Sequence, residues 1–292
     1  MASLTHLPAP AKLNLFLHVI GQRADGYHLL QSVFALIDWA DQLHIETRND
    51  GQLRRHDLGP TLPCEDLCLR AARLLQSESG SPLGADISID KQLPWGAGMG
   101  GGSSDAATVL LALNQLWNLH WPKERLATLA LRLGADVPFF VQGHNAWVEG
   151  IGEQITPIAL PAEVINTPIA VLKPPVAVPT QAIFSSEALS RATEPATVSL
   201  FLAAPKCFGR NDLQAPAELY SSQISQALEI MQGHFGNSRM TGSGSAVFSW
   251  TTMNNTAKPL SFAPIDLGLS DPSWAGRLCH VLARHPLFDV LD

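Results

Sequence analysis

The segment 94–104 restricts this chain more than any other feature, because five of its eleven residues are glycine. Glycine reaches positive φ without steric cost, and its missing Cβ lets backbone amides approach a ligand closely. Before this segment, residues 85–90 alternate in polarity with a period of two and predict a strand. After it, an alanine-rich apolar run predicts a helix over 106–117, with the residues at 103–105 as candidate N-caps.

The predicted order of strand, glycine loop and helix indicates a phosphate-binding site. A helix N-terminus presents unpaired N–H groups and a partial positive charge, both of which favour an anion. The loop is not a Walker A loop, because no Gly-Lys-Ser/Thr ends it. Gly96, Gly98 and Gly101 satisfy a bare G-x-G-x-x-G, but the acidic residue that a dinucleotide site needs about twenty positions later is missing. A glycine turn with a purely structural role is the remaining alternative.

Composition and charge exclude several classes of protein. The length of 292 residues suits one large domain or two, and 46% hydrophobic against 15% charged residues indicates a globular chain. A net charge of −7 disfavours a nucleic-acid partner. No apolar run reaches the length of a membrane span, and Lys12 and Asn14 interrupt the first apolar segment, unlike the core of a signal peptide. We therefore expect a cytoplasmic protein with neither a nucleic-acid nor a membrane partner.

The four cysteines predict no metal site. Cys64 and Cys68 are close in sequence, but no second pair completes a zinc site, so reduced thiols are the expected state. No histidine belongs to an H-E-x-x-H motif, and metal ligands stay unassigned.

The first predicted strand, over residues 11–20, places Lys12 and Asn14 on one face because strand side chains alternate. Both residues on a solvent face would be the ordinary alternative. Other patterns predict strands at 30–37 and 43–47, a polar loop over 50–63 and a single helix over 217–233.

Five strings of residues, spread over about residues 8–250, together resemble the motifs of the GHMP kinases. The form of these motifs is most similar to the branch that phosphorylates 4-diphosphocytidyl-2-C-methyl-D-erythritol. The strings are Pro10-Ala11-Lys12-Leu13-Asn14, Arg23-Ala24-Asp25-Gly26-Tyr27-His28, the glycine loop itself, Leu133-Gly134-Ala135-Asp136-Val137-Pro138 and Met240-Thr241-Gly242-Ser243-Gly244.

The resemblance implies an α+β, two-domain GHMP-kinase fold with the active site in the interdomain cleft. We place the N-terminal domain at 1–158 and the C-terminal domain at 159–292. The implied reaction uses ATP and Mg²⁺ to phosphorylate the 2-hydroxyl of 4-diphosphocytidyl-2-C-methyl-D-erythritol, a step in non-mevalonate isoprenoid (terpenoid) biosynthesis. The implied assembly is a monomer or a homodimer.

The resemblance also implies roles for individual residues. Lys12 and Asp136 would be catalytic, although Asp136 could instead cap a short helix that follows it. ATP would contact the loop residues Pro94, Trp95, Gly96, Ala97, Gly98, Met99, Gly100, Gly101, Gly102, Ser103 and Ser104. The cytidine substrate would contact Asn14, Tyr27, His28, Phe34, Thr180, Phe184, Thr241 and Gly242.

Two alternative functions stay open, and two departures from the family pattern bear on them. Another GHMP kinase, such as homoserine kinase, is disfavoured by the string at 25–28, whereas a catalytically inactive nucleotide-binding relative is disfavoured by the intact Lys12 and Asp136. Leu67 stands where relatives carry an asparagine that helps to seat the nucleotide base. The segment 251–292 also differs from the charged helix that is usual there.

Overall fold

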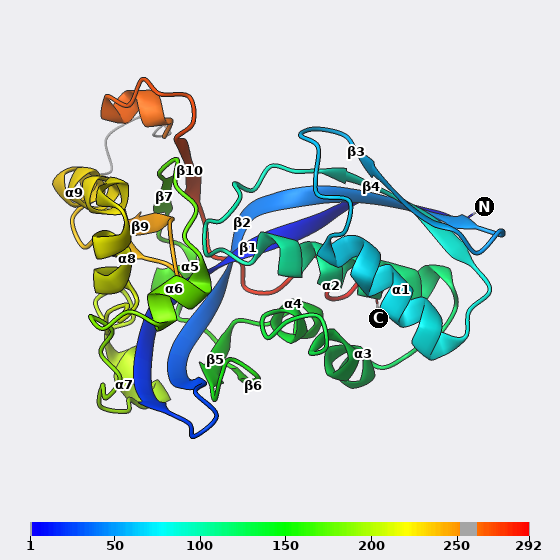
Figure 1. Ribbon diagram of the computed structural model, residues 1–292, viewed down its shortest axis with the longest axis horizontal. Coiled ribbons are helices and arrows are strands. Elements are labelled where there is room, and N and C mark those ends of the chain that lie inside the picture. The colour runs from blue at the N-terminus through cyan, green and yellow to red at the C-terminus, as the bar shows by residue number, and fades with distance from the viewer. Residues whose placement is uncertain (1, 252–261, 292) are drawn as a thin grey trace.

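Two long, paired antiparallel strands run through both halves of the molecule (Figure 1). The computed structural model describes residues 2–251 and 262–291. β1 (Ser3–Gln22) and β2 (His28–Arg48) pair over nearly their whole length. Their register shifts at four places, between Leu4 and Leu7, Pro10 and Lys12, Asn14 and Leu17, and Val19 and Gly21. Such bulges bend and twist a strand pair, and here the pair reaches from one half of the molecule into the other (Figure 1).

The first sheet has the strand order β3-β4-β2-β5-β6, with β1 paired to β2. Four helices cover one face of this sheet, and the glycine loop leads into the second of them (Figure 1). These elements are β3 (Leu53–Asp57), α1 (Leu67–Ser79), β4 (Gly84–Asp90), α2 (Gly101–Leu116), α3 (Lys123–Ala130), α4 (Val137–Gln142), β5 (Ala146–Glu149) and β6 (Gln154–Pro157). α2 is buried along most of its length, as its apolar sequence predicts.

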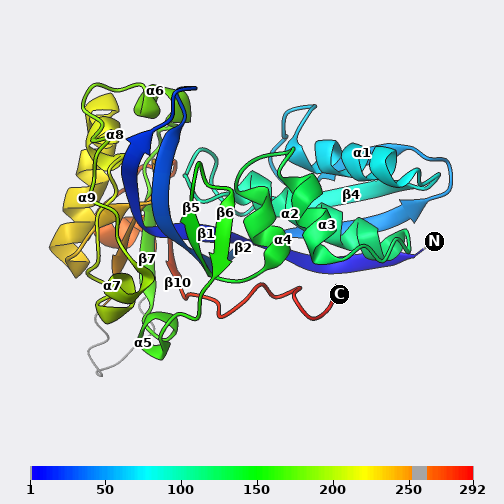
Figure 2. The same ribbon diagram turned by 90° about the horizontal axis from the view of Figure 1, so that it is seen from below.

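The second sheet is antiparallel, with the order β10-β7-β9-β8, and α8 and α9 lie over its outer side (Figures 1 and 2). The elements of this half are α5 (Ala162–Ile165), β7 (Ile169–Lys173), α6 (Thr180–Phe184), α7 (Val198–Ala203), α8 (Gln214–Tyr220), α9 (Ser222–Phe235), β8 (Arg239–Met240), β9 (Val247–Trp250), the 3₁₀ helix η1 (Pro264–Leu267) and β10 (Ala275–Cys279). The division at residues 158 and 159 stays a prediction.

Several predicted elements were wrong in extent. The predicted strands at 30–37 and 43–47 are one continuous strand, and the predicted polar loop at 50–63 contains β3, because pairing with β4 outweighs its polar sequence. The predicted single helix at 217–233 breaks at Ser221, which is extended and accepts a capping bond from the amide of Gln223. α2 starts at Gly101 with Gly100 at the N-cap, so the residues at 103–105 lie inside the helix.

The C-terminal segment returns from β10 toward the end of the molecule where the N-terminus lies (Figure 2). Val281 forms a β-bridge with Ile37 of β2, and Arg284 forms one with His144. The predicted departure at 251–292 falls partly on residues 252–261, which lie outside the described residues. All four cysteines are free, and no helix among the described residues is long and apolar enough to cross a membrane.

Candidate active site

Glycine is required in the loop before α2 by both backbone conformation and space. Gly96, Gly98 and Gly100 have φ of 61°, 72° and 72°, which is the left-handed region that other L-residues rarely adopt. A Cβ on Gly98 would lie 2.6 Å from the carbonyl oxygen of Thr241. The loop therefore packs closely against a second glycine turn, formed by residues 241–245 between β8 and β9. The amides of Ser245 and Ala246 donate to loop carbonyls at 3.1 Å.

A cavity of about 450 Å³ opens on the side of this loop that faces α1. It is lined by the loop residues, by the start of α1 and by the segment that precedes α1, including Leu62, Pro63, Asp66 and Leu67. Trp95 lies at its edge with 58% of its surface exposed. An apolar cavity that adjoins glycine-rich backbone suits a nucleotide, with the base in the cavity and the phosphates at the loop.

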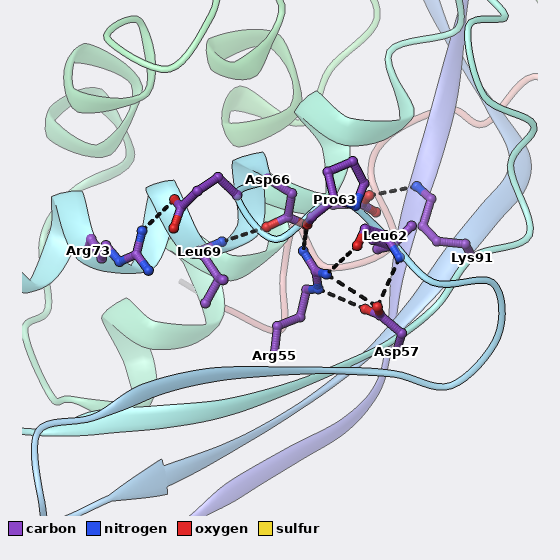
Figure 3. A network of polar contacts seen from close by, with 10 residues as sticks. Arg55, Asp57, Leu62, Pro63, Asp66, Leu69, Arg73 and Lys91 are labelled. Atoms are coloured by element: carbon purple, nitrogen blue, oxygen red, sulfur yellow. Dashed lines mark hydrogen bonds and ion pairs between the residues drawn. The ribbon is translucent and has the colours of Figure 1, made fainter.

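An arginine that sequence reasoning missed holds the wall of this cavity (Figure 3). The guanidinium of Arg55, on β3, donates to Asp57 at 2.7 Å, lies 3.1 Å from Asp66 and donates to the carbonyl oxygens of Leu62 and Pro63. Asp66 also accepts from the amide of Leu69 at 3.0 Å and so caps α1. The wall beside Leu67 is thus built from a part-buried network of one arginine and two aspartates.

The side chains of Lys12, Asn14 and Asp136 meet at a different cavity, which Gly98 and Gly100 of the loop also line. β1 carries Lys12 and Asn14, and the Lys12 Nζ donates to the Asn14 Oδ1 at 2.5 Å. The Nζ also lies 3.7 Å from the Asp136 Oδ2 and 4.2 Å from the centre of the Phe34 ring. Both strand residues are buried, so the solvent-face alternative is wrong.

Asp136 occupies the N-cap position of α4, but its side chain makes no capping hydrogen bond. About one third of that side chain is exposed, and the carboxylate faces Lys12. Burial lowers the pKa of Lys12, and the attraction of Asp136 only partly opposes this. A buried ammonium with one partly exposed carboxylate partner has charge to spare for an anionic ligand.

Hydrogen bonds from both halves of the molecule hold Asn14. Its backbone N–H donates to the Thr241 Oγ1 at 2.8 Å, and its side-chain Nδ2 donates to the Ser32 Oγ at 2.8 Å. The Nδ2 of Asn211 donates to the carbonyl oxygens of Met240 and Gly242 and fixes the second glycine turn. Sequence reasoning did not include Ser32, because it acts through a partner on another strand.

Two adjoining cavities extend from Lys12 toward β2. The inner one, about 310 Å³, is lined by residues of both halves, including Lys12, Asn14, Phe34, Gly98, Asp136, Thr180, Phe184 and Gly242. The outer one, about 640 Å³, is lined by Tyr27, His28, Thr180, Phe184 and Arg191, among others. The rings of His28 and Phe184 lie 5.1 Å apart with an interplanar angle of 30°, whereas Tyr27 is 60% exposed.

The predicted residues are therefore gathered into two connected places. Of the residues predicted to contact ATP, those at 94–103 line the cavity of about 450 Å³, and Gly98 and Gly100 also line the inner one. Ser104 is buried inside α2 and lines neither cavity. Most of those predicted to contact the second substrate line the inner or outer cavity. Thr241 supports Asn14 through a hydrogen bond instead. This arrangement can hold a nucleotide triphosphate on one side of Lys12 and an acceptor with an aromatic base on the other.

Comparison with known proteins agrees with this geometry. Residues 66–144 match the model of the GHMP kinases N terminal domain. A 4-diphosphocytidyl-2-C-methyl-D-erythritol kinase of Methylibium petroleiphilum is 62% identical over 287 residues, which are 98% of each chain. The enzyme of the same name from Albidiferax ferrireducens is 52% identical over 98% of this chain and 95% of its own.

Solved structures show the same fold. A crystal structure of 4-(cytidine 5'-diphospho)-2C-methyl-D-erythritol kinase has a TM-score of 0.74 and 33% identity, over 96% of this chain and 99% of its own. The mevalonate kinase of Methanococcus jannaschii, at 14% identity and a TM-score of 0.64 over 96% of this chain and 98% of its own, shares the fold. The expected α+β GHMP-kinase fold is thereby confirmed. Because it is 62% and 52% identical to two 4-diphosphocytidyl-2-C-methyl-D-erythritol kinases over 98% of its length, the chain belongs to that family of the GHMP kinases.

Proposed function

We propose that this kinase transfers the γ-phosphoryl group of ATP to the 2-hydroxyl of 4-diphosphocytidyl-2-C-methyl-D-erythritol, in non-mevalonate isoprenoid biosynthesis. The observation that carries the proposal is the position of the Lys12–Asp136 pair. It lines the inner cavity, between the glycine loop and the cavity that contains His28 and Phe184. A phosphate donor and an acceptor bound on the two sides would meet there.

The chemistry needs little more than positioning and charge neutralisation. Asp136 accepts the proton of the 2-hydroxyl as its oxygen attacks the γ-phosphorus. The bond from that phosphorus to the β–γ bridging oxygen breaks, and ADP leaves with the electron pair. The Lys12 ammonium stabilises the negative charge that develops on the transferred group. Asn14, held by Ser32 and Thr241, orients the Lys12 Nζ.

The residues present fit a Mg²⁺ ion. Mg²⁺ is usually bound through one or two carboxylates and the substrate phosphates, not by a cage made of protein ligands alone. The described residues include no cluster of three or more acidic, histidine or cysteine side chains suited to a metal, whereas Asp136 offers one partly exposed carboxylate. The ion would bind mainly the ATP phosphates and would neutralise their charge, while Asp136 keeps an oxygen free for the proton of the 2-hydroxyl.

The cytidine end of the substrate would lie in the outer cavity. Phe184 offers a face for stacking, and base–aromatic stacking is worth about 1–3 kcal/mol per base. His28 lies beside that face, and the exposed Tyr27 could close over a bound base from the turn before β2. A monomer or homodimer in the cytoplasm remains our expectation.

A substrate panel tests the proposal. ADP release is measured with ATP and Mg²⁺ in the presence of the cytidine substrate, of homoserine or of mevalonate, and the product is examined by ³¹P NMR. We expect turnover with the cytidine substrate alone and a new phosphomonoester at its 2-position. Faster turnover of homoserine would assign another GHMP activity, and failure to release ADP with any acceptor would support the inactive relative.

A further inference from the structure

Arg191 connects the two walls of the outer cavity, and no motif in the sequence singles it out. It lies in the segment between α6 and α7 and lines that cavity. Its Nε donates to the Nε2 of His28 at 3.1 Å, across 163 positions in the chain. The side chain therefore joins the start of β2 to a segment in the other half of the molecule.

The rest of the guanidinium holds the segment that carries Phe184. Nη2 donates to the carbonyl oxygens of Phe184 at 3.1 Å and Ser186 at 3.0 Å, and Nη1 donates to that of Leu189 at 3.2 Å. A guanidinium can make such a fan of bonds because its donors are rigid and coplanar, which the single ammonium of lysine cannot do. One side chain thus sets where Phe184 lies relative to His28.

The contact with His28 also determines its protonation. An arginine in a protein remains protonated and has no acceptor, so the His28 Nε2 must accept the bond. A neutral imidazole that accepts at Nε2 carries its proton on Nδ1. His28 consequently presents an Nδ1–H donor.

We propose that Arg191 is a positioning residue for the acceptor substrate: it fixes His28 as a neutral Nδ1–H donor and holds Phe184 beside it. This rests on the proposed function, in which the outer cavity binds the cytosine. A donor at this position favours a base that presents an acceptor. We place this donor opposite the ring N3, because O2 is an acceptor in both bases, whereas N3 is an acceptor in cytosine and N3–H is a donor in uracil. The arrangement then selects cytidine over uridine.

The electrostatic setting supports the neutral form. Burial lowers the pKa of His28, and the positive charge of Arg191 lowers it further. The other titratable groups that line this cavity are Asp25 and Tyr27, both on the turn before β2. Removal of the Arg191 charge should therefore raise the His28 pKa toward its ordinary value of about 6.5.

The test compares Arg191→Gln and Arg191→Lys with wild type, using CDP and UDP as probes of the base pocket. Calorimetry gives their affinities in the presence of an ATP analogue, and NMR of the His28 ring protons gives its pKa. Arg132→Gln is the matched control, because Arg132 is an exposed arginine paired with Glu78 outside these cavities. Melting curves and ATP affinity report whether each variant is folded.

We expect Arg191→Gln to weaken CDP binding by about ten- to a hundred-fold, as for the loss of a charged hydrogen bond. The preference for CDP over UDP should shrink and the His28 pKa should rise. Arg191→Lys should restore part of the pKa shift but little of the affinity, and Arg132→Gln should behave as wild type.

The outcomes separate this inference from the proposed function. If wild type binds neither CDP nor the cytidine substrate, the base pocket itself is misassigned. If wild type binds CDP and a folded Arg191→Gln variant binds it equally well, the positioning role is overturned while the proposed function stands. Weaker CDP binding with an unchanged CDP-to-UDP ratio and an unchanged His28 pKa would overturn the tautomer assignment.

Discussion

Two buried lysines on either side of the glycine loop have opposite electrostatic surroundings. Lys91 follows β4 and pairs with two buried carboxylates, those of Asp41 and Asp105, the latter at 2.7 Å. Lys12, on β1, is more deeply buried and faces one carboxylate, that of Asp136, at 3.7 Å and about one third exposed. The side chains of Lys91 and Lys12 are 9% and 5% exposed, so the two lysines differ more in their partners than in their exposure.

The pKa shifts of the two lysines point in opposite directions. Burial by itself would lower the pKa of both lysines. For Lys91 the attraction of Asp105 and Asp41 outweighs burial, so the net shift of its pKa is upward. For Lys12 burial prevails over Asp136, and its pKa is lowered. A lysine whose burial is balanced by its carboxylate partners has a structural role. An undercompensated lysine, whose burial is not balanced in this way, lowers stability but keeps a charge that a phosphate can use.

The surroundings of Lys91 agree with a structural role. The Asp41 Oδ1 accepts from the amides of Gln92 at 2.6 Å and Leu93 at 2.8 Å, directly before the glycine loop. Burial, together with the Asp41 carboxylate, raises the pKa of Asp105 to about 8, although Lys91 opposes this. The three side chains hold the segment before the glycine loop against α2, in which Asp105 lies.

The largest expected effect is on catalysis, at the undercompensated lysine and its partner. Asp136→Asn should lower kcat by about a hundred- to ten-thousand-fold, as for loss of a general base. Lys12→Met should lower kcat similarly, while its melting temperature stays at or above that of wild type because a buried charge is removed. Steady-state kinetics and melting curves check both variants. Near-normal kcat in folded Asp136→Asn would refute its role as the base.

The opposite pattern is expected at Lys91. Lys91→Met leaves two acids buried without their cation, so the free energy of unfolding should fall by about 3–5 kcal/mol. Denaturant titration measures this loss. The double variant Lys91→Met/Asp41→Asn removes the stranded carboxylate and should recover part of this loss, because the Asn Oδ1 can still accept from the amides of Gln92 and Leu93. A loss below about 1 kcal/mol would mean that the two lysines are not different in kind.

The last expected effect is a pH dependence of stability from Asp105. Its pKa is about 8 in the folded protein and about 3.9 in an unfolded chain. Between these values the folded state binds more protons, so the free energy of unfolding falls as pH rises, by at most about 1.4 kcal/mol per pH unit. Asp105→Asn should remove this slope when unfolding is compared between pH 5 and 8. A slope that persists in that variant would place the titrating group elsewhere.

Local patterns predicted the parts of the site that depend on near neighbours. Strand alternation placed Lys12 and Asn14 on one face, and glycine density predicted the loop between β4 and α2, for which we propose a phosphate-binding role. The start of α2 was misplaced, because a glycine in the left-handed conformation at its N-cap replaced the side-chain cap that the serines suggested. β3 was missed because its pairing with β4 determines it more than its polar residues do.

The sequence by itself determined which chemical groups this protein can use: the glycine loop, the lysine and asparagine on one strand, and the aspartate before α4. Only the tertiary structure decided which of them are left with unused charge or a fixed proton. Lys91 meets Asp41 across 50 positions, Asn14 meets Thr241 across 227, and Arg191 meets His28 across 163. Such partners are set by strand register and by the packing of the two halves, which signals extending over a few residues do not specify. Burial and pKa depend on those partners, so the difference between Lys12 and Lys91 arises only on folding.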